Sequence, residues 1–218
     1  MSLSQEAEAV VRNQARSPWI AIIGVDGTGK TSVLNQIEQS LPSLPFTSME
    51  VLHRRPRIAY QNKVDQPGKI AHYQKPPHSA LVSTIKLGVM LLDWQLGYWR
   101  RIKRQRASGA LVVADRHSLL DLLADPLRYR YGGPARLIRF AVRLAPMPDL
   151  IILLDAPLEV LQKRKREVPI ENLRVMRDKY LEMSRWLPNC VVIDASQPLA
   201  VVVADVKRFI LRACDLPP

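Results

Sequence analysis

The feature that most constrains this chain is the segment at residues 24–31, GVDGTGKT, which fits the pattern G-x-x-x-x-G-K-[ST]. A short apolar run at 19–23 precedes it, and a helix-forming stretch at 31–39 follows. In such a strand, loop and helix arrangement, backbone N–H groups and the helix N-terminus point at a bound phosphate. A glycine-rich turn that binds nothing is the alternative, but it does not require these flanking elements. The segment therefore predicts a nucleoside triphosphate site at the end of a buried strand.

Side chains within this loop add specific roles to the prediction. Lys30 is expected to neutralise β and γ phosphate oxygens, and the Thr31 hydroxyl is expected to bind Mg²⁺. The expected cofactors are therefore ATP and Mg²⁺. The residues expected to bind the nucleotide are Gly24, Asp26, Gly27, Thr28, Gly29, Lys30, Thr31 and Ser32.

Short apolar runs recur along the chain and alternate with helical patterns. This alternation predicts an α/β fold with three layers, in which helices cover both faces of a five-stranded parallel sheet. The strands are expected at 19–23, 48–52, 110–114, 149–154 and 190–194. The helices are expected at 5–15, 31–39, 79–106, 117–123, 134–145, 157–167, 170–186 and 198–213. One domain spanning residues 1–218 accounts for all of these elements, with 1–16 as an N-terminal extension.

Composition and charge exclude several classes of protein. The polar first residues lack the layout of a secretory signal, so a cytoplasmic location is expected. A net charge of +12 raises the question of nucleic-acid binding. Much of the excess lies in two clusters, at 100–106 and 163–166, and no recognised nucleic-acid motif is present, so no nucleic-acid partner is expected. The apolar stretch at 81–99 is interrupted by Lys86 and Asp93, which favours a buried helix over a membrane span.

Three of the expected strands end in aspartate, and ligands of such sheets bind beyond the carboxyl ends of the strands. Asp155 and Asp194 have an ordinary alternative as helix caps or turn residues. Asp115 differs because Arg116 follows it directly. A carboxylate there can hold the magnesium shell or accept a proton, and an arginine can bind a transferring or acceptor phosphate. Asp115 and Arg116 are therefore expected catalytic residues, with Asp115 also a metal ligand.

Four segments together resemble the thymidylate kinase-like group of P-loop kinases. In that family the aspartate at the position of Asp26 faces the acceptor sugar. The segment at 53–56, HRRP, resembles the family's Arg-Glu-Pro segment, which implies that Arg54 or Arg55 grips the acceptor phosphate. The segment at 115–117, DRH, resembles the family's Asp-Arg-Tyr motif. The run at 152–157 and the basic helix after it resemble the fourth strand and a lid at about 157–172.

The resemblance also suggests a role for the second basic cluster. Some thymidylate kinases carry an arginine within the phosphate loop, and others supply it from the lid. Here the loop has no arginine, so Arg164 or Arg166 of the lid is expected to stabilise charge on the γ-phosphoryl group. A solvated helix face is the alternative for this cluster.

Base recognition departs from the family pattern. The family reads thymine partly with a Phe and an Arg on the long helix, where this chain has Met90 and Trp94. The family's Ser-x-x-Ala-Tyr-Gln segment is replaced by SLLDLL at 118–123. Trp94 either stacks on the acceptor or packs in the core, and the aromatic loop at 129–133 either contacts substrate or is structural.

The resemblance implies a kinase that transfers the γ-phosphoryl group of ATP to a small-molecule acceptor, a nucleoside monophosphate such as dTMP or a similar compound. The alternatives are a related kinase acting on a sugar or lipid-linked acceptor in surface polysaccharide metabolism, and a non-catalytic ATP-binding module. Family members are typically dimers, and the apolar face of 81–99 offers a surface for a homodimer. The basic residues from Arg100 to Arg106 offer a peripheral contact with anionic lipid.

Overall fold

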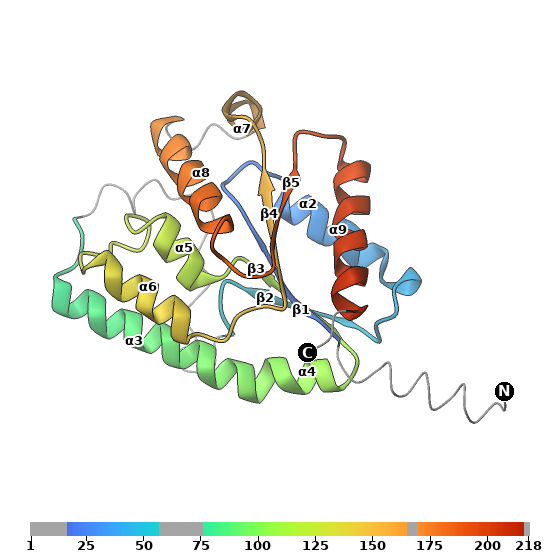
Figure 1. The fold of residues 1–218 in the computed structure, drawn as a ribbon, viewed down its shortest axis with the longest axis horizontal. Coiled ribbons are helices and arrows are strands. Elements are labelled where there is room, and N and C mark those ends of the chain that lie inside the picture. The colour runs from blue at the N-terminus through green and yellow to red at the C-terminus, as the bar shows by residue number, and fades with distance from the viewer. Residues whose placement is uncertain (1–16, 57–75, 165–169, 216–218) are drawn as a thin grey trace.

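The computed structural model describes residues 17–56, 76–164 and 170–215, which form a sheet between two layers of helices (Figure 1). All the strands are parallel, in the order β2-β3-β1-β4-β5. Their bounds are β1 Trp19–Ile23, β2 Met49–His53, β3 Leu111–Asp115, β4 Leu150–Asp155 and β5 Cys190–Asp194. Each strand lies within one residue of its expected position, and the expected α/β fold is confirmed.

The helices lie on both faces of this sheet. One face carries α2 (Lys30–Gln39) and α9 (Leu199–Asp215), which contact each other. The other face carries α3 (Ala80–Gly97), α5 (Ser118–Ala124), α6 (Ala135–Leu144) and α8 (Ile170–Ser184). The remaining helical segments are η2 (Leu41–Ser43), η4 (Tyr98–Ile102), α4 (Lys103–Ala107) and α7 (Leu158–Arg164). The expected helix at 5–15 and the last residues of the one at 157–167 lie outside the described residues.

Burial follows from this layering. Every residue of β1 is completely buried, since helices cover both faces of the central strand and its side chains meet no water. The edge strand β5 is only partly covered, and Val192 is about half exposed. The strands that predicted the sheet are continuous apolar runs because both of their faces are buried. A strand with only one buried face would alternate apolar and polar residues.

The long helix expected at 79–106 is interrupted at η4, a π-helical segment that separates α3 from α4. Gly97, just before it, lies against the ring of Pro56 so closely that a Cβ would collide with the ring. Arg101 of η4 donates a hydrogen bond to the Pro56 carbonyl at 3.0 Å and forms an ion pair with Glu50. These contacts fasten the segment after β2 to the helix. Within the described ranges, no helix is long and apolar enough to cross a membrane.

A fully buried aromatic stack lies between the sheet and α3. The rings of His117 and Trp94 are parallel, with centroids 3.9 Å apart, and Trp19 of β1 stacks on Trp94 at 5.8 Å. Within the described residues no hydrogen bond of standard geometry reaches either ring nitrogen of His117, although the Pro146 backbone lies near enough to act on the ring. Burial lowers the pKa of His117 to about 4, against smaller opposing effects of the Asp121 carboxylate and the Pro146 backbone.

We expect His117 to make the fold sensitive to acid. The unfolded chain binds this proton near pH 6.5 and the folded chain only near pH 4, so stability is fully present above about pH 6.5 and falls as the pH approaches 4. The full shift corresponds to about 3 kcal/mol. Urea unfolding of the wild type and His117→Phe across this range measures it. The variant should show the shallower pH dependence, and parallel curves would show that His117 is not responsible.

Candidate active site

The candidate site lies at the carboxyl ends of the strands, around the loop that follows β1. The strand order reverses at β1, because the chain leaves it toward β3 and β2 on one side and continues to β4 and β5 on the other. Connections diverge at such a point and leave a crevice, which is where open parallel sheets bind ligands. The phosphate-loop segment found in the sequence occupies this position.

Backbone geometry makes the loop after β1 suited to phosphate. Gly24 has a φ of +139°, and a Cβ there would collide with the carbonyl oxygen of Leu154, so only glycine lets the loop lie this close to β4. Gly29 is the N-cap of α2, and no side chain caps the helix. The first N–H groups of α2 therefore point out of the helix toward the loop, as an anion requires.

Lys30 is the cation of this loop, and its side chain is almost completely buried. Its ammonium group donates to the carbonyl oxygens of Gly24 at 2.8 Å and Val25 at 2.7 Å, and to the Thr28 hydroxyl at 3.2 Å. Burial lowers the pKa of Lys30 to about 7, with a further lowering by the Arg116 guanidinium. A phosphate bound here would place negative charge beside the ammonium group and favour its protonated form. This effect grows with the number of phosphate charges, so the loop suits a polyphosphate.

Arg116 lies at the centre of a buried charge cluster that joins the phosphate loop to β3. Its guanidinium forms ion pairs with Asp26 of the loop and with Asp121 of α5, the latter at 3.7 Å, and it donates to the Gly24 carbonyl at 3.4 Å. Burial alone would lower the pKa of Arg116, but the two carboxylates outweigh it and raise the pKa. The expected site residues Asp26 and Arg116 are therefore in direct contact.

Residues that the sequence did not single out as site residues surround this cluster. Arg128, in the loop between α5 and α6, lies 3.5 Å from the second oxygen of Asp26. The Tyr180 hydroxyl of α8 donates to Asp121 at 2.5 Å, and burial together with that carboxylate raises the pKa of Tyr180. The buried hydroxyl of Tyr129 makes no hydrogen bond with the described residues. All three side chains thus come from segments that follow β3 or β4, far from the loop in sequence.

Only one of these residues could have been identified as a site residue from the sequence. Asp121 is the one charged residue in the apolar run at 118–123, and a charge at a buried helix position indicates a partner. Tyr180 and Arg128 lie in unremarkable helix and loop sequence, and only the fold brings them to Asp26 and Asp121. The sequence allows either a substrate contact or a structural role for the loop at 129–133. Its neighbour Arg128 reaches the cluster in the structure.

The expected metal ligands lie on adjoining elements. Asp115 ends β3, beside Ile22 of β1 in the sheet register, and Thr31 is exposed on the first turn of α2. One oxygen of Asp115 lies 3.4 Å from a ring nitrogen of His53. In the described ranges, no three His, Cys, Asp or Glu side chains gather as a metal site. A magnesium ion that takes most of its ligands from phosphates and water needs only one or two such side chains, so the residues fit it.

The two arginines after β2 have different surroundings. Arg55 faces the long helix, where its guanidinium lies 3.8 Å from the completely buried carboxylate of Asp93. Arg54 has a positive φ of 65°, and its backbone N–H donates to the Asp115 carbonyl at 2.9 Å. Arg54 also acts electrostatically on Tyr129, so its charge reaches the cluster around Asp121. Of the two candidates for the acceptor phosphate, the geometry favours Arg54.

Trp94 lies in the core rather than at the surface of the site. It is completely buried in the stack with His117 and Trp19, and its indole N–H donates to the Ser118 hydroxyl at 3.0 Å. A ring without exposed surface cannot stack on an acceptor, so the structure corrects the expected substrate contact of Trp94 and supports its alternative role as core.

Asp155 is a second correction. Both its oxygens accept hydrogen bonds from Arg177 of α8, so the carboxylate does not cap a helix.

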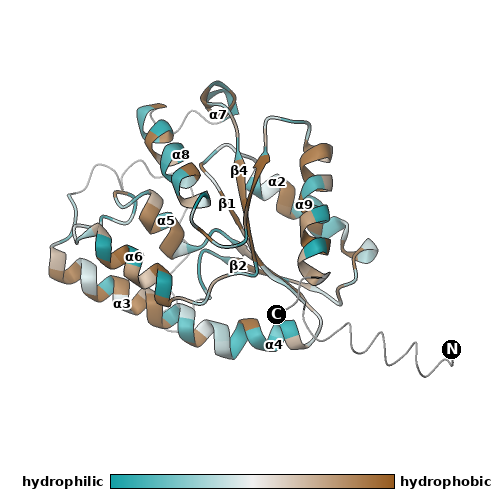
Figure 2. Cartoon of the chain, in the orientation of Figure 1, coloured by the Kyte–Doolittle hydropathy of each residue, from teal (hydrophilic) through white to brown (hydrophobic). Residues whose placement is uncertain are grey.

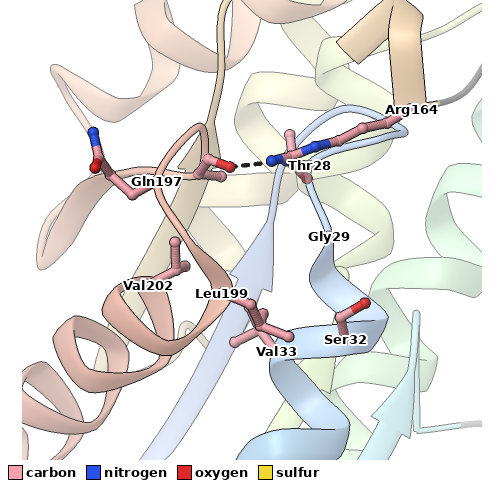
Figure 3. A pocket seen from close by; sticks show the side chains of 9 residues that line it. Thr28, Gly29, Ser32, Val33, Arg164, Gln197, Leu199 and Val202 are labelled. Atoms are coloured by element: carbon pink, nitrogen blue, oxygen red, sulfur yellow. Dashed lines mark hydrogen bonds between the residues drawn. The ribbon is translucent and has the colours of Figure 1, made fainter. Parts of the chain in front are cut away.

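A hollow of about 180 Å³ opens on the other side of the phosphate loop (Figure 3). Apolar side chains of α2 and α9 line it, and polar groups stand at its rim; the lining residues are Thr28, Gly29, Ser32, Val33, Arg164, Ala195, Gln197, Leu199 and Val202. Complete ligand pockets are larger, roughly 300–1,000 Å³, so this hollow suits one part of a ligand, such as a flat ring.

Arg164 of α7 contributes to the rim of that hollow. Its guanidinium donates to the Ala195 carbonyl at 2.8 Å, and Figure 3 shows it reaching past Thr28 toward the loop after β5. That loop is held by Asp194, which accepts hydrogen bonds from Gln197 and Ser196; these bonds lower the pKa of Asp194 to about 2. The other expected lid arginine, Arg166, lies outside the described residues.

The fold and the loop define a P-loop kinase, since strand order, phosphate loop and a strand-end Asp-Arg pair occur together. The family model described as thymidylate kinase matches residues 22–206. A probable thymidylate kinase of Archaeoglobus fulgidus is 31% identical over 88% of this chain and 93% of its own length. A probable thymidylate kinase of Pyrobaculum calidifontis is 26% identical over 89% of this chain and 96% of its own. The chain belongs to the thymidylate kinase family and is a kinase, a phosphotransferase.

The pKa of Lys30 predicts that phosphate binding is coupled to proton uptake. Above about pH 8 the phosphates are fully ionised, while much of Lys30 in the free protein has lost its proton. Nucleotide binding should restore that proton, so affinity should fall up to about tenfold per pH unit between roughly pH 8 and 9. Calorimetry in buffers of different ionisation enthalpy counts the protons. Affinity that does not change over this range would contradict the low pKa.

Proposed function

We propose that this chain is a cytoplasmic ATP- and Mg²⁺-dependent kinase that phosphorylates a nucleoside monophosphate, dTMP or a similar acceptor. The observation that carries the proposal is the contact of Asp26 with Arg116 and Arg128. This contact joins the donor loop to charged groups on the opposite side of the sheet's crevice. A module that only binds ATP has no use for a second set of charges there, which argues against a non-catalytic role.

The donor side of the site would hold ATP from phosphates to base. Lys30 and the N-terminus of α2 would hold the β and γ phosphates, and the glycine backbone allows their close approach. The hollow bordered by Arg164 and Gln197 would hold the base, with α2 and α9 packing against the ring. Thr31 and Asp115 would hold Mg²⁺, which neutralises phosphate charge when it is bound.

The acceptor side would be formed by Asp26, Arg54, Arg116 and Arg128. Arg54 and Arg128 would hold the acceptor's phosphate, and Asp26 would fix the position of Arg128 through their ion pair. An oxygen of the acceptor then forms a bond to the γ-phosphorus as the bond to the bridging β–γ oxygen breaks, and ADP leaves. Charge that develops on the transferring group would be stabilised by Lys30, Arg116 and an arginine of the lid.

A lid of about residues 157–172 is part of this proposal. Its first helix, α7, carries Arg164 to the donor side, and α8 after it carries Tyr180 to Asp121 on the acceptor side. A kinase must exclude water to avoid hydrolysing ATP, so the lid, which leads directly into the helix that carries Tyr180, would close over the site when both substrates are bound.

A second acceptor class, a sugar or lipid-linked compound, is favoured by one observation. The family's base-reading arginine is replaced by Trp94, which is buried in the core. No side chain at that position can therefore form hydrogen bonds to a base. Either another element recognises the base or the acceptor has none.

The acceptor class can be tested by phosphoryl transfer from labelled ATP. We expect transfer to one member of a panel of nucleoside monophosphates, nucleosides, sugar phosphates and lipid-linked phosphates. Lys30→Ala should lower the rate at least about 100-fold, because it removes a buried cation from the transferring phosphates. Transfer to a nucleoside monophosphate would support the main proposal. ATP binding without transfer to any acceptor would contradict the kinase mechanism.

The position of Arg164 predicts that it binds the nucleotide base. Arg164→Ala should raise the KM and Kd for ATP about tenfold, since a guanidinium over a ring contributes up to about 2 kcal/mol, and should change kcat much less. The exposed neighbour Lys163 provides the matched control, Lys163→Ala. Arg166→Ala should instead lower kcat if the lid's catalytic arginine is Arg166. A drop in kcat for Arg164→Ala at unchanged KM would assign the catalytic role to Arg164.

A further inference from the structure

The Arg116 guanidinium is held unevenly at its two terminal nitrogens. One of them pairs with Asp26 of the phosphate loop. The other has only long contacts, 3.4 Å to the Gly24 carbonyl and 3.7 Å to a carboxylate oxygen of Asp121. Charge-assisted hydrogen bonds between such groups are usually about 2.7–2.9 Å long. This loosely held nitrogen of Arg116 therefore retains the capacity to donate to an oxygen of a bound phosphate.

Asp121 is the group that would otherwise engage this nitrogen of Arg116. Its side chain is buried on α5, and the oxygen nearer to Arg116 is Oδ2. Oδ2 is buried and makes no hydrogen bond with any residue that the structure describes. A buried carboxylate and a buried guanidinium normally approach to hydrogen-bonding distance, because neither has water to bind. The separation of 3.7 Å therefore requires an interaction that holds Asp121 back.

The Tyr180 hydroxyl supplies that interaction. It donates to the other carboxylate oxygen of Asp121, Oδ1, at 2.5 Å. Burial and the Asp121 carboxylate raise the pKa of Tyr180, so the hydroxyl keeps its proton and remains a donor at physiological pH. A strong donor on Oδ1 draws the carboxylate toward α8 and withdraws negative charge from Oδ2.

The helix that carries Tyr180 is fixed by other contacts as well. Its apolar side chains Leu173 and Met176 are buried, and α8 contacts α5 and β4. Figure 2 shows both apolar and hydrophilic colour along α8. Arg177, on the same helix, donates to both oxygens of Asp155 at the end of β4. Packing and this ion pair therefore keep α8 in position even when the Tyr180 hydroxyl is removed.

We propose that Tyr180 is a positioning residue that holds Asp121 away from Arg116 and so keeps one nitrogen of the guanidinium available to the transferring phosphoryl group. This role rests on the proposed function, in which Arg116 stabilises charge on that group. Without the Tyr180 hydroxyl, Asp121 turns toward Arg116, because a buried carboxylate oxygen that loses its donor is costly unless another donor replaces it. Both ends of the guanidinium then bind carboxylates, and its contact with the phosphoryl group weakens.

Hydrolysis of labelled ATP with Mg²⁺ and no added acceptor tests this role. Water then takes the γ-phosphoryl group, because its oxygen bonds to phosphorus as the bond to the bridging β–γ oxygen breaks, so the test does not depend on the acceptor. We expect Tyr180→Phe to lower kcat about tenfold, less than the roughly 100- to 1,000-fold loss that follows complete removal of a donor. The Kd for ATP should not change, since Lys30 and the N-terminus of α2 still bind the phosphates.

Tyr98→Phe is the matched control, because it removes the hydroxyl of a partly buried tyrosine outside the site. It should hydrolyse ATP like the wild type. An unchanged Kd for ATP reports that each variant is folded. Wild-type kcat in Tyr180→Phe, or an equal loss of kcat in Tyr98→Phe, would overturn the proposal.

Asp121→Asn distinguishes this role from a merely structural one. An amide keeps an oxygen that accepts from Tyr180 but lacks the charge that attracts Arg116. We expect Asp121→Asn to hydrolyse ATP within about threefold of the wild-type rate, and Tyr180→Phe added to it to change the rate less than about twofold. The same loss from Tyr180→Phe in both backgrounds would show that Tyr180 does not act through Asp121 and would overturn the proposal.

Lys30→Ala separates failure of this role from failure of the proposed function. Hydrolysis that survives in Lys30→Ala at the wild-type rate would not arise at the phosphate loop, and both would then be overturned. Hydrolysis that is lost in Lys30→Ala but unchanged in Tyr180→Phe would leave the kinase site in place and overturn the positioning role alone.

Discussion

The buried guanidinium of Arg116 is the interaction on which the rest of the site depends. Removing an unpaired cation from water costs several kcal/mol, so a buried arginine persists only where carboxylates meet it. Here one carboxylate comes from the phosphate loop and the other from α5, and Asp121 in turn holds Tyr180 of α8. One charge therefore fixes the donor loop, the end of β3 and the helix after the lid relative to one another.

The backbone is locally strained at two arginines that lie at the carboxyl ends of the strands. Arg116 and Arg54 each follow a strand and each has a positive φ, 71° and 65°, which a residue with a side chain rarely adopts. Such conformations cost of order 1–3 kcal/mol and persist where surrounding contacts enforce them. Hydrogen bonds supply that enforcement, since Arg116 N–H donates to Ile22 and Arg54 N–H donates to Asp115. The sharp turns after β2 and β3 bring both side chains to the same edge of the sheet.

Local patterns in the sequence were sufficient to predict the strands and the phosphate loop. A strand buried on both faces is a short apolar run, and the loop's glycines occur within eight residues, so each pattern is visible in a short segment. The strand-end pattern predicted Arg116, and the family resemblance added the acceptor role of Asp26 and the acceptor arginines. The contacts of Asp121 with Tyr180, and of Asp155 with Arg177, connect positions on different elements, and no local pattern specifies them. Trp94 could not be assigned from its sequence position either, because a tryptophan on an apolar helix has the same pattern in a core and in a pocket.

The distribution of charge shows how a kinase with a net charge of +12 divides its basic residues between the crevice and the rest of its surface. At the crevice, basic groups are balanced by Asp26, Asp115 and Asp121, and the excess there is what a polyphosphate ligand would neutralise. Many other exposed basic residues lie away from the crevice, among them those on α4 and α6. Basic residues that face water favour solubility.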